Sequence, residues 1–115
     1  MKPDNILVSA SGHLKLADFG LSKMHIDDTY SSNSFVGSHP YLAPEIVAKM
    51  SYGKSVDWYG VGAVLYEFCL ARPPGYSESI EDLKENIQTD ALELPKRLPS
   101  ELKDLLMRLL SRNPL

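Results

Sequence analysis

The chain has 115 residues, of which 43% are hydrophobic and 23% are charged. This balance is that of a globular protein and excludes an intrinsically disordered chain. The length permits one compact domain or a piece of a larger one. The formal net charge of -3 argues against nucleic acid or an anionic lipid surface as the main partner.

Neither a targeting segment nor a membrane span is expected. The first 20 residues lack a basic start followed by an apolar core, which a signal peptide requires. The most apolar stretch, residues 55–70, is short for a membrane span and carries Asp57 and Glu67. The single cysteine, Cys69, cannot form an internal disulfide and is expected to be a buried thiol. A cytoplasmic or nuclear location follows by default.

The N-terminal region is expected to form a β-hairpin. The short runs NILV (residues 5–8) and HLKLA (residues 13–17) are apolar or alternating and are separated by SASG, which predicts two strands with Gly12 in the turn. Asn5 would start the first strand, and Asp18 would follow the end of the second. Because the strands of a hairpin are antiparallel, both side chains are expected at the same end.

The middle of the chain changes from a loop to helices. Residues 24–40 show no periodicity and are rich in Ser, Asp, Asn and Thr, which predicts an exposed loop. Residues 43–50, APEIVAKM, predict a short helix with Pro44 in its first turn. Residues 55–70 are apolar on almost every side, which predicts a central helix that is buried all round.

Trp58 and Tyr59 within this central stretch are expected to be core residues. Residues 79–87, SIEDLKENI, predict a short amphipathic helix. In residues 100–112, SELKDLLMRLLSR, leucines recur at i, i+3, i+4, i+7 and i+8, which predicts a surface helix with Ser100 as a candidate cap. The fold class is therefore mainly α with a small β-hairpin.

Three polar residues near the N-terminus suggest phosphate and metal chemistry. Asn5 and Asp18 are oxygen donors of the kind that Mg²⁺ binds together with waters and substrate phosphates. Lys2 could supply positive charge to a transferring phosphoryl group. Taken singly, the Asp-Phe-Gly triplet could be an ordinary turn and the Pro-Asp-Asn triplet an ordinary strand start. Their order and spacing together favour a shared site.

The linked motifs resemble those of eukaryotic protein kinases. KPDN is similar to the second half of the family's His-Arg-Asp-Leu-Lys-x-x-x-Asn catalytic loop, and DFG is similar to its metal-binding triplet. APE (residues 43–45) resembles the end of the activation segment, and DWYGVG, beginning at Asp57, resembles the buried helix motif. The resemblance covers essentially the whole chain. It implies a C-terminal lobe (C-lobe), with an N-lobe and the chain's far end missing.

The resemblance divides the chain into a catalytic-loop remnant (1–5), a metal-binding triplet (18–20), an activation segment (18–45) and a helical part (46–115). It implies Mg²⁺ bound by Asn5 and Asp18, ATP phosphate contacted by Lys2, and a substrate hydroxyl aligned by Ser38. The structural roles that it implies fall on Leu7 and Phe19 in internal stacks, Gly20, Glu45 at the end of the activation segment, and Asp57 beneath the catalytic loop.

SFVGSHPYLAPE and GKSVDWYGVGAVLYEF are most similar to the AGC group of serine/threonine kinases. This similarity places Ser34 at the activation-loop phosphorylation site, for an upstream kinase, and Lys23 at a position that helps bind the phosphate. Ser38 stands where the group usually has Thr. His39-Pro40 replaces the usual Pro-Glu, which alters the surface that reads the protein substrate.

By this alignment the catalytic aspartate would stand just before Met1, and the arginine that pairs with Glu45 would follow Leu115. We therefore expect a kinase fragment that is inactive alone, with Glu45 lacking its usual partner. The alternative is a non-catalytic, kinase-like module that binds protein partners through the helices of residues 79–110. An in-frame His-Arg-Asp sequence upstream would exclude this alternative.

Overall fold

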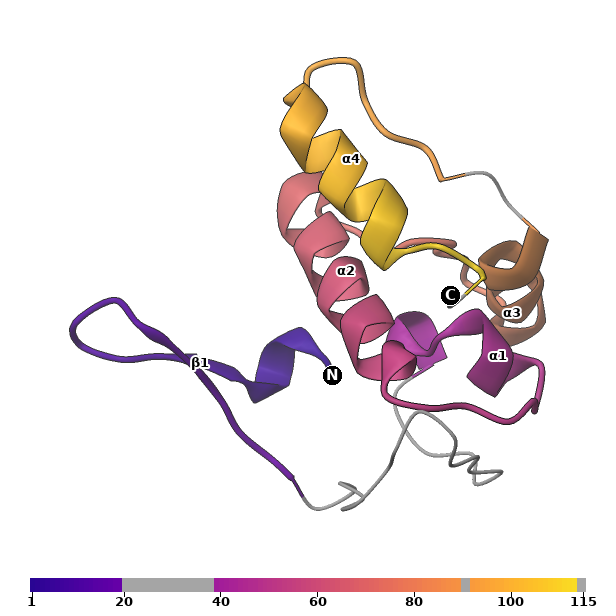
Figure 1. The fold of residues 1–115 in the computed structure, drawn as a ribbon, viewed down its shortest axis with the longest axis horizontal. Coiled ribbons are helices and arrows are strands. Elements are labelled where there is room, and N and C mark those ends of the chain that lie inside the picture. Colours follow the sequence, from indigo (N-terminus) through magenta and orange to yellow (C-terminus); the bar gives the residue numbers. More distant parts are fainter. Residues whose placement is uncertain (20–38, 90–91, 114–115) are drawn as a thin grey trace.

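The computed structural model describes residues 1–19, 39–89 and 92–113. These residues form two short 3-10 helices, a two-stranded sheet and four α-helices (Figure 1). In chain order the elements are η1 (Pro3–Asn5), β1 (Ile6–Val8), β2 (Leu14–Leu16), η2 (His39–Tyr41), α1 (Pro44–Val47), α2 (Ser55–Leu70), α3 (Ile80–Thr89) and α4 (Ser100–Leu109). The mainly helical class with one hairpin is confirmed for this part of the chain.

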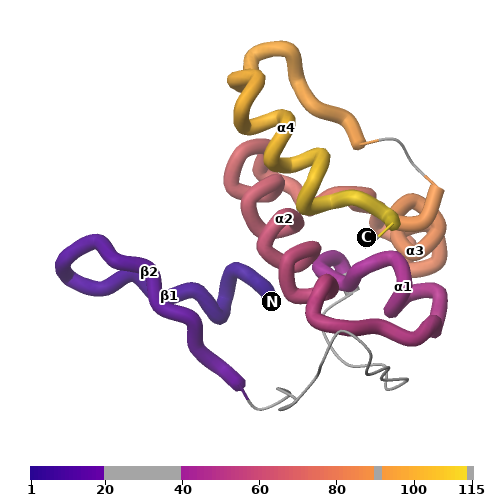
Figure 2. The backbone as a smooth tube through the Cα atoms, viewed as in Figure 1, coloured from indigo at the N-terminus to yellow at the C-terminus, as the bar shows by residue number. Residues whose placement is uncertain are grey.

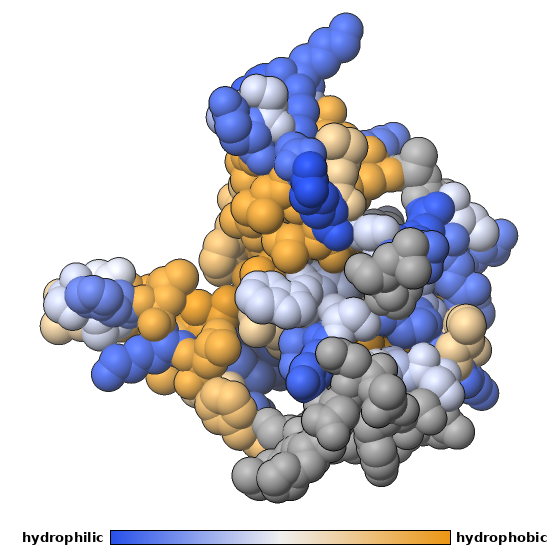
Figure 3. Space-filling model, viewed as in Figure 1, coloured by the Kyte–Doolittle hydropathy of each residue, from blue (hydrophilic) through white to orange (hydrophobic). Residues whose placement is uncertain are grey.

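The predicted hairpin is present, and its strands are antiparallel. Ile6 lies opposite Leu16, and Val8 lies opposite Leu14. Gly12 sits in the turn with a φ of 81°, a left-handed conformation that glycine adopts without strain. The hairpin projects away from the helices (Figure 2). Its strand leucines and Val8 are exposed, and hydrophobic side chains cover much of its surface in Figure 3.

α1 is shorter than the sequence predicts. Pro44 occupies its first turn as expected, but the helix ends at Val47 rather than continuing to Met50. Lys49 has a φ of 56°, and the Met50 amide donates to the Glu45 carbonyl at 2.8 Å. Together with the bond from the Lys49 amide to the Ile46 carbonyl, this bond closes the helix in a Schellman motif. Glycine usually occupies the left-handed position of this motif, so a lysine there gave no sequence signal for the early helix end.

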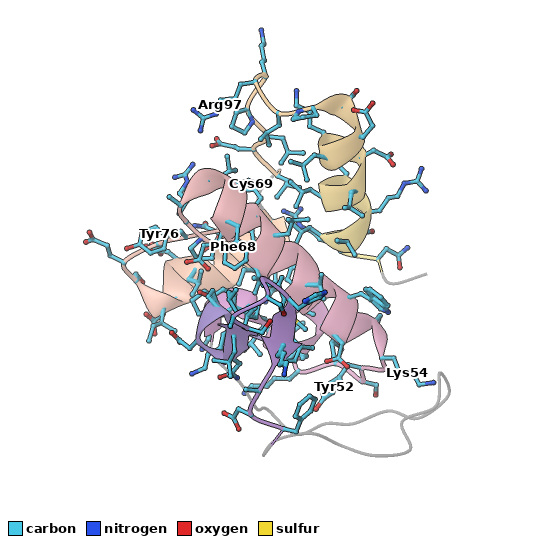
Figure 4. All side chains as sticks on the ribbon, turned by 90° about the vertical axis from the view of Figure 1, so that its left-hand side faces the viewer. Tyr52, Lys54, Phe68, Cys69, Tyr76 and Arg97 are labelled. Atoms are coloured by element: carbon cyan, nitrogen blue, oxygen red, sulfur yellow. The ribbon has the colours of Figure 1, made fainter. Side chains whose placement is uncertain are left out.

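α2 has the bounds that the sequence predicts, but it is not buried all round. Tyr59 and Tyr66 lie in the core, whereas Trp58 is 65% exposed and Phe68 is also exposed. The expectation that Trp58 is a core residue is therefore wrong. Figure 4 shows Phe68 and Cys69 near the end of α2, and Cys69 is half-buried. Within the described residues, α4 and η2 both pack against this helix.

α4 carries the predicted leucine stripe, and α2 packs against it (Figure 1). Leu106 is fully buried and Leu110 is buried, while Leu105 is 45% exposed. Ser100 is not a cap, because the helix begins at Ser100 itself and its hydroxyl donates to Glu101. No helix in the described parts of the chain is long and apolar enough to cross a membrane.

Candidate functional site

The hairpin register brings two candidate metal ligands to one end of the sheet. The Ala17 amide donates to the Asn5 carbonyl at 2.8 Å, so Asn5 lies opposite the residue that precedes Asp18. This arrangement agrees with the sequence prediction that both emerge at the same end. Asp18 has a φ of 60°. Aspartate tolerates this left-handed region better than most residues, and such conformations are common at functional sites.

The loop that precedes the hairpin carries Lys2 and Asp4. The Lys2 Nζ lies 3.7 Å from the Asp4 Oδ2, and the Asp4 side chain is largely exposed. An exposed pair at this distance contributes little to stability, so Lys2 can exchange this partner for a more strongly charged one. The loop is held at its N-terminal end by Met1, which packs against Gly60 of α2.

The loop of residues 1–5 rests against α2 through Met1 and Gly60. A Cβ added at Gly60 would lie 3.2 Å from the Met1 Cβ, which is tighter than ordinary contact. Asp57 is one turn earlier in α2 and has an exposed side chain. Residues three apart in a helix share a face, so Asp57 lies on the side of α2 where the loop approaches. Its predicted anchoring role stays a prediction.

The charge of Glu45 acts on the buried Tyr59 of α2. Burial raises the pKa of Tyr59 from 10.0 to about 12. The Arg112 guanidinium works against this rise, and the Glu45 carboxylate adds to it. The Arg112 Nη1 also donates to the Thr89 carbonyl at 3.0 Å. Arg112, which the sequence did not single out, thus supplies positive charge that acts on Tyr59.

A hydrogen bond between Tyr41 and Glu67 is a second feature that the sequence did not indicate. The Tyr41 hydroxyl donates to the Glu67 Oε2 at 2.7 Å, joining η2 to α2. Burial is the largest cause that raises the pKa of Tyr41, followed by this hydrogen bond and the charges of Glu67 and Asp4. The available signal was the acidic Glu67 inside the apolar run of residues 55–70.

Leu7 and Phe19, which the resemblance places in internal stacks, are both exposed here, and their stacking stays a prediction. Leu7 is 54% exposed and Phe19 is 67% exposed. Both residues belong to the hairpin or the stretch just after it, and this part projects away from the helices (Figure 1). Within the described residues, the helical core therefore does not cover them.

Four predicted positions lie outside the described residues, and their roles stay predictions. These are Gly20, Lys23, Ser34 and Ser38. Among the residues that the structure does describe, no group of three or more His, Cys, Asp and Glu gathers as a metal cluster.

A cleft of about 770 Å³ lies elsewhere, between α2, residues 72–76, α3 and residues 110–113. Tyr59, Tyr66, Arg72 and Arg112 are among the residues that line it. The Arg72 Nη2 lies 3.3 Å from the Glu93 Oε2 at its edge. Of the candidate residues that the structure describes, Lys2, Asn5 and Asp18 do not line this cleft.

Comparisons with known proteins identify the family. The protein kinase domain family matches residues 1–115, and the chain therefore belongs to that family. Its relatives include the serine/threonine-protein kinase gad8 of Schizosaccharomyces pombe, 42% identical over 114 residues, and YPK1 of Saccharomyces cerevisiae, 40% identical over 114 residues. The rat RAC-beta serine/threonine-protein kinase is also 40% identical over 114 residues.

These relatives are serine/threonine kinases of the AGC type, as the sequence motifs predict. Each alignment covers 99% of this chain but only 20%, 17% and 24% of the three relatives in the order named. The chain thus spans about a fifth of the length of the curated relatives that it matches. The activity of a whole kinase is accordingly a proposal for this chain.

Proposed function

We propose that residues 1–115 are C-lobe material of an AGC-type serine/threonine protein kinase. The whole enzyme would transfer the γ-phosphoryl group of ATP to a serine or threonine of a protein substrate. Residues 1–5 are the end of the catalytic loop, 18–20 the metal-binding triplet, 18–45 the activation segment and 46–115 the helical part. Family membership at about 40% identity supports this division.

The observation that carries the proposal is the hairpin register. The 2.8 Å bond from the Ala17 amide to the Asn5 carbonyl puts the start of β1 beside the residue that precedes Asp18. Carboxylate and amide oxygens are hard donors, and Mg²⁺ commonly takes one or two of them, with waters and substrate phosphates filling its shell. The donor set therefore fits Mg²⁺ with ATP. Bound there, the metal would neutralise charge on the phosphates.

Lys2 has the chemistry to act beside this metal site. Its ammonium group reaches Asp4 only at 3.7 Å, and that partner is largely exposed. A transferring phosphoryl group carries more negative charge than one carboxylate, and stabilising that charge dominates catalysis of phosphoryl transfer. Lys2 would leave Asp4 for the phosphate when nucleotide binds, while the packing of Met1 on Gly60 holds the loop in place.

The activation segment would provide substrate alignment and regulation. Ser38 would hydrogen-bond near the substrate hydroxyl. Ser34 would accept a phosphate from an upstream kinase, and Lys23 would help to bind that phosphate. A phosphoserine adds about -1.5 to -2 charge and can order a loop by pairing with cations. These roles rest on the resemblance of SFVGSHPYLAPE to the kinase pattern.

We further propose that the 115-residue chain has no kinase activity by itself. Residues 1–115 match only about a fifth of the length of the whole kinases that resemble them. Incubation with Mg²⁺, ATP and a basic peptide should give no phosphopeptide above background. Nucleotide binding should be weaker than micromolar, which corresponds to less than about 8 kcal/mol of binding free energy.

The proposed function is best tested in a chimera. Residues 1–115 would replace the matching segment of the fission yeast gad8 kinase, which aligns over 99% of this chain. We expect the chimera to phosphorylate a basic peptide and Asp18→Asn to lower turnover by at least 100-fold, because one Mg²⁺ ligand is lost. Asp104→Asn is the matched control, since Asp104 forms only an exposed ion pair with Arg108 on α4.

Two results would contradict the proposal. In the first, Asp18→Asn and Asp104→Asn would have equal activity in an active chimera. In the second, a chimera that circular dichroism shows to be folded would transfer no phosphate. The second result would favour the non-catalytic module. The next measurement would then be a pull-down that compares partner binding by the chain with α3 and α4 unchanged and by a variant in which the charges on these helices are reversed.

A further inference from the structure

The cleft between α2, residues 72–76, α3 and residues 110–113 has a charged rim and an apolar floor. Its volume of about 770 Å³ lies within the range of sites that hold small organic ligands. Figure 1 shows the segment after α4 running towards α3, which brings the end of the described chain to this cleft. The floor is made by buried apolar residues, namely Pro73, Pro74, Ile87 and Leu110.

Arg112 supplies positive charge at one end of the cleft. Its Nη1 donates to the carbonyl of Thr89, the last residue of α3, at 3.0 Å. A guanidinium has five N–H donors, so Arg112 can hold this carbonyl and a ligand together. Burial raises the pKa of the cleft-lining Tyr59 to about 12, and the Arg112 guanidinium opposes this rise by more than the Glu45 carboxylate adds to it. Of these two charges, the arginine therefore has the larger effect on this part of the cleft.

Arg72 supplies positive charge at the other end. Its Nη2 donates to the Glu93 Oε2 at 3.3 Å, and the two side chains are 56% and 81% exposed. An exposed pair of this kind contributes little to stability, so a ligand carboxylate can take the place of Glu93. Burial raises the pKa of Tyr66, and the Arg72 guanidinium opposes this rise by more than the Glu93 carboxylate adds to it.

The two arginines are set apart along α2. Tyr59 and Tyr66 both line the cleft, and their positions in the helix differ by about two turns, or about 10 Å along the axis. Arg112 acts on Tyr59 and Arg72 acts on Tyr66, so the guanidinium groups lie towards different ends of this stretch. Among the described residues that line the cleft, two arginines and one glutamate sum to +1 (2 minus 1), whereas the whole chain carries -3.

We propose that this cleft binds a small organic dicarboxylate whose acidic groups lie about 10 Å apart. Arg112 pairs with one carboxylate and Arg72 with the other, because the planar fork of a guanidinium matches a carboxylate. The apolar part of the ligand between the two carboxylates contacts the floor of the cleft. The site is independent of the proposed kinase function, since Lys2, Asn5 and Asp18 do not line it.

Titration of the 115-residue chain with decanedioate tests the proposal. In this probe a straight hydrocarbon chain separates two carboxylates by about the rise of two helical turns. We expect a Kd of about 1 mM or tighter, with amide chemical-shift changes in residues 72–76, 86–87 and 110–113. Decanoate, which lacks the second carboxylate, should bind about tenfold more weakly. Added salt should weaken the binding of decanedioate, because exposed charges are screened.

Three variants test the role of the arginines. Arg72→Gln and Arg112→Gln each remove one charge, and each should weaken decanedioate binding about tenfold and abolish most of the preference over decanoate. Arg72→Gln leaves the core untouched, because the Arg72 side chain is exposed. Arg97→Gln is the matched control, since Arg97 is exposed and does not line the cleft (Figure 4). It should leave the Kd within about twofold.

Four results would each overturn the proposal. Equal affinities for decanedioate and decanoate would refute the second carboxylate contact, and equal losses in Arg72→Gln and Arg97→Gln would indicate a general charge effect. Shift changes in the hairpin instead of the cleft would place the probe on the exposed apolar strands. No binding at about 10 mM decanedioate would exclude the site. Kinase assays in the chimera with gad8 do not bear on this cleft, so a failure of the proposed function is distinguishable from a failure here.

Discussion

Gly62 of α2 packs closely against α4, and Gly62→Ala should force the two helices apart. A Cβ at this position would lie 2.7 Å from the Leu109 Cβ and 3.1 Å from two side-chain atoms of Leu110. Ordinary contact starts at 3.4 Å, so the helices must separate by roughly 0.7 Å (3.4 minus 2.7). A Cβ is fixed to the backbone and cannot swing aside as the tip of a long side chain can.

Two opposing effects decide the magnitude. Overpacking a well-packed interface costs about 1–3 kcal/mol, and the fixed position of the Leu109 Cβ puts this site in the upper part of that range. Replacing glycine by alanine inside a helix contributes about 1 kcal/mol in the opposite direction. Overpacking wins, and we expect a net loss of about 1–2 kcal/mol in the free energy of unfolding.

Urea unfolding followed by circular dichroism measures this loss. With a slope of about 1–3 kcal/mol per molar for a small protein, the urea midpoint should fall by about 0.3–2 M. Gly53→Ala is the matched control, because nothing lies within 4 Å of a Cβ added there, and it should be neutral or slightly stabilising. If Gly62→Ala were as stable as Gly53→Ala, the close packing of α2 on α4 would be refuted.

Three further changes test the core, the buried tyrosine and the activation segment. Leu106→Ala should lower the free energy of unfolding by about 2–5 kcal/mol because Leu106 is fully buried. Leu105→Ala, at a 45% exposed site, should lower it by less than about 1 kcal/mol. Equal losses for the two variants in urea unfolding would contradict the assigned core. The pKa of Tyr59 rises from 10.0 to about 12 on folding, so its stabilising contribution is complete below pH 10 and is lost as the pH rises towards 12. In Tyr59→Phe, the free energy of unfolding should fall less between pH 9 and pH 11 than in the unaltered chain. An unaltered pH dependence would argue against the raised pKa of Tyr59. In the chimera, Ser34→Ala should cut turnover at least tenfold, or about 1.4 kcal/mol, and Lys23→Ala should cut it less; wild-type turnover in Ser34→Ala would exclude phosphate control.

The sequence alone determined the features that depend on neighbours along the chain. A glycine between two apolar runs specified the hairpin and its turn, and the hairpin placed Asn5 and Asp18 at one end. The apolar length of residues 55–70, followed by Pro73 and Pro74, specified α2 with its observed bounds. Periodicity and proline placement are local signals, so each could be read without knowing what packs where.

Only the tertiary structure decided which surfaces are covered and which side chains meet. Trp58 and Tyr59 are adjacent aromatic residues in one apolar helix, yet Tyr59 is in the core and Trp58 is exposed. The contact of Tyr41 with Glu67 spans 26 residues, and the charge of Arg112 reaches Tyr59 from the far end of the chain. A local pattern tells which residues share a face. Whether that face is buried, and which polar groups meet, depends on segments that the chain brings together only on folding.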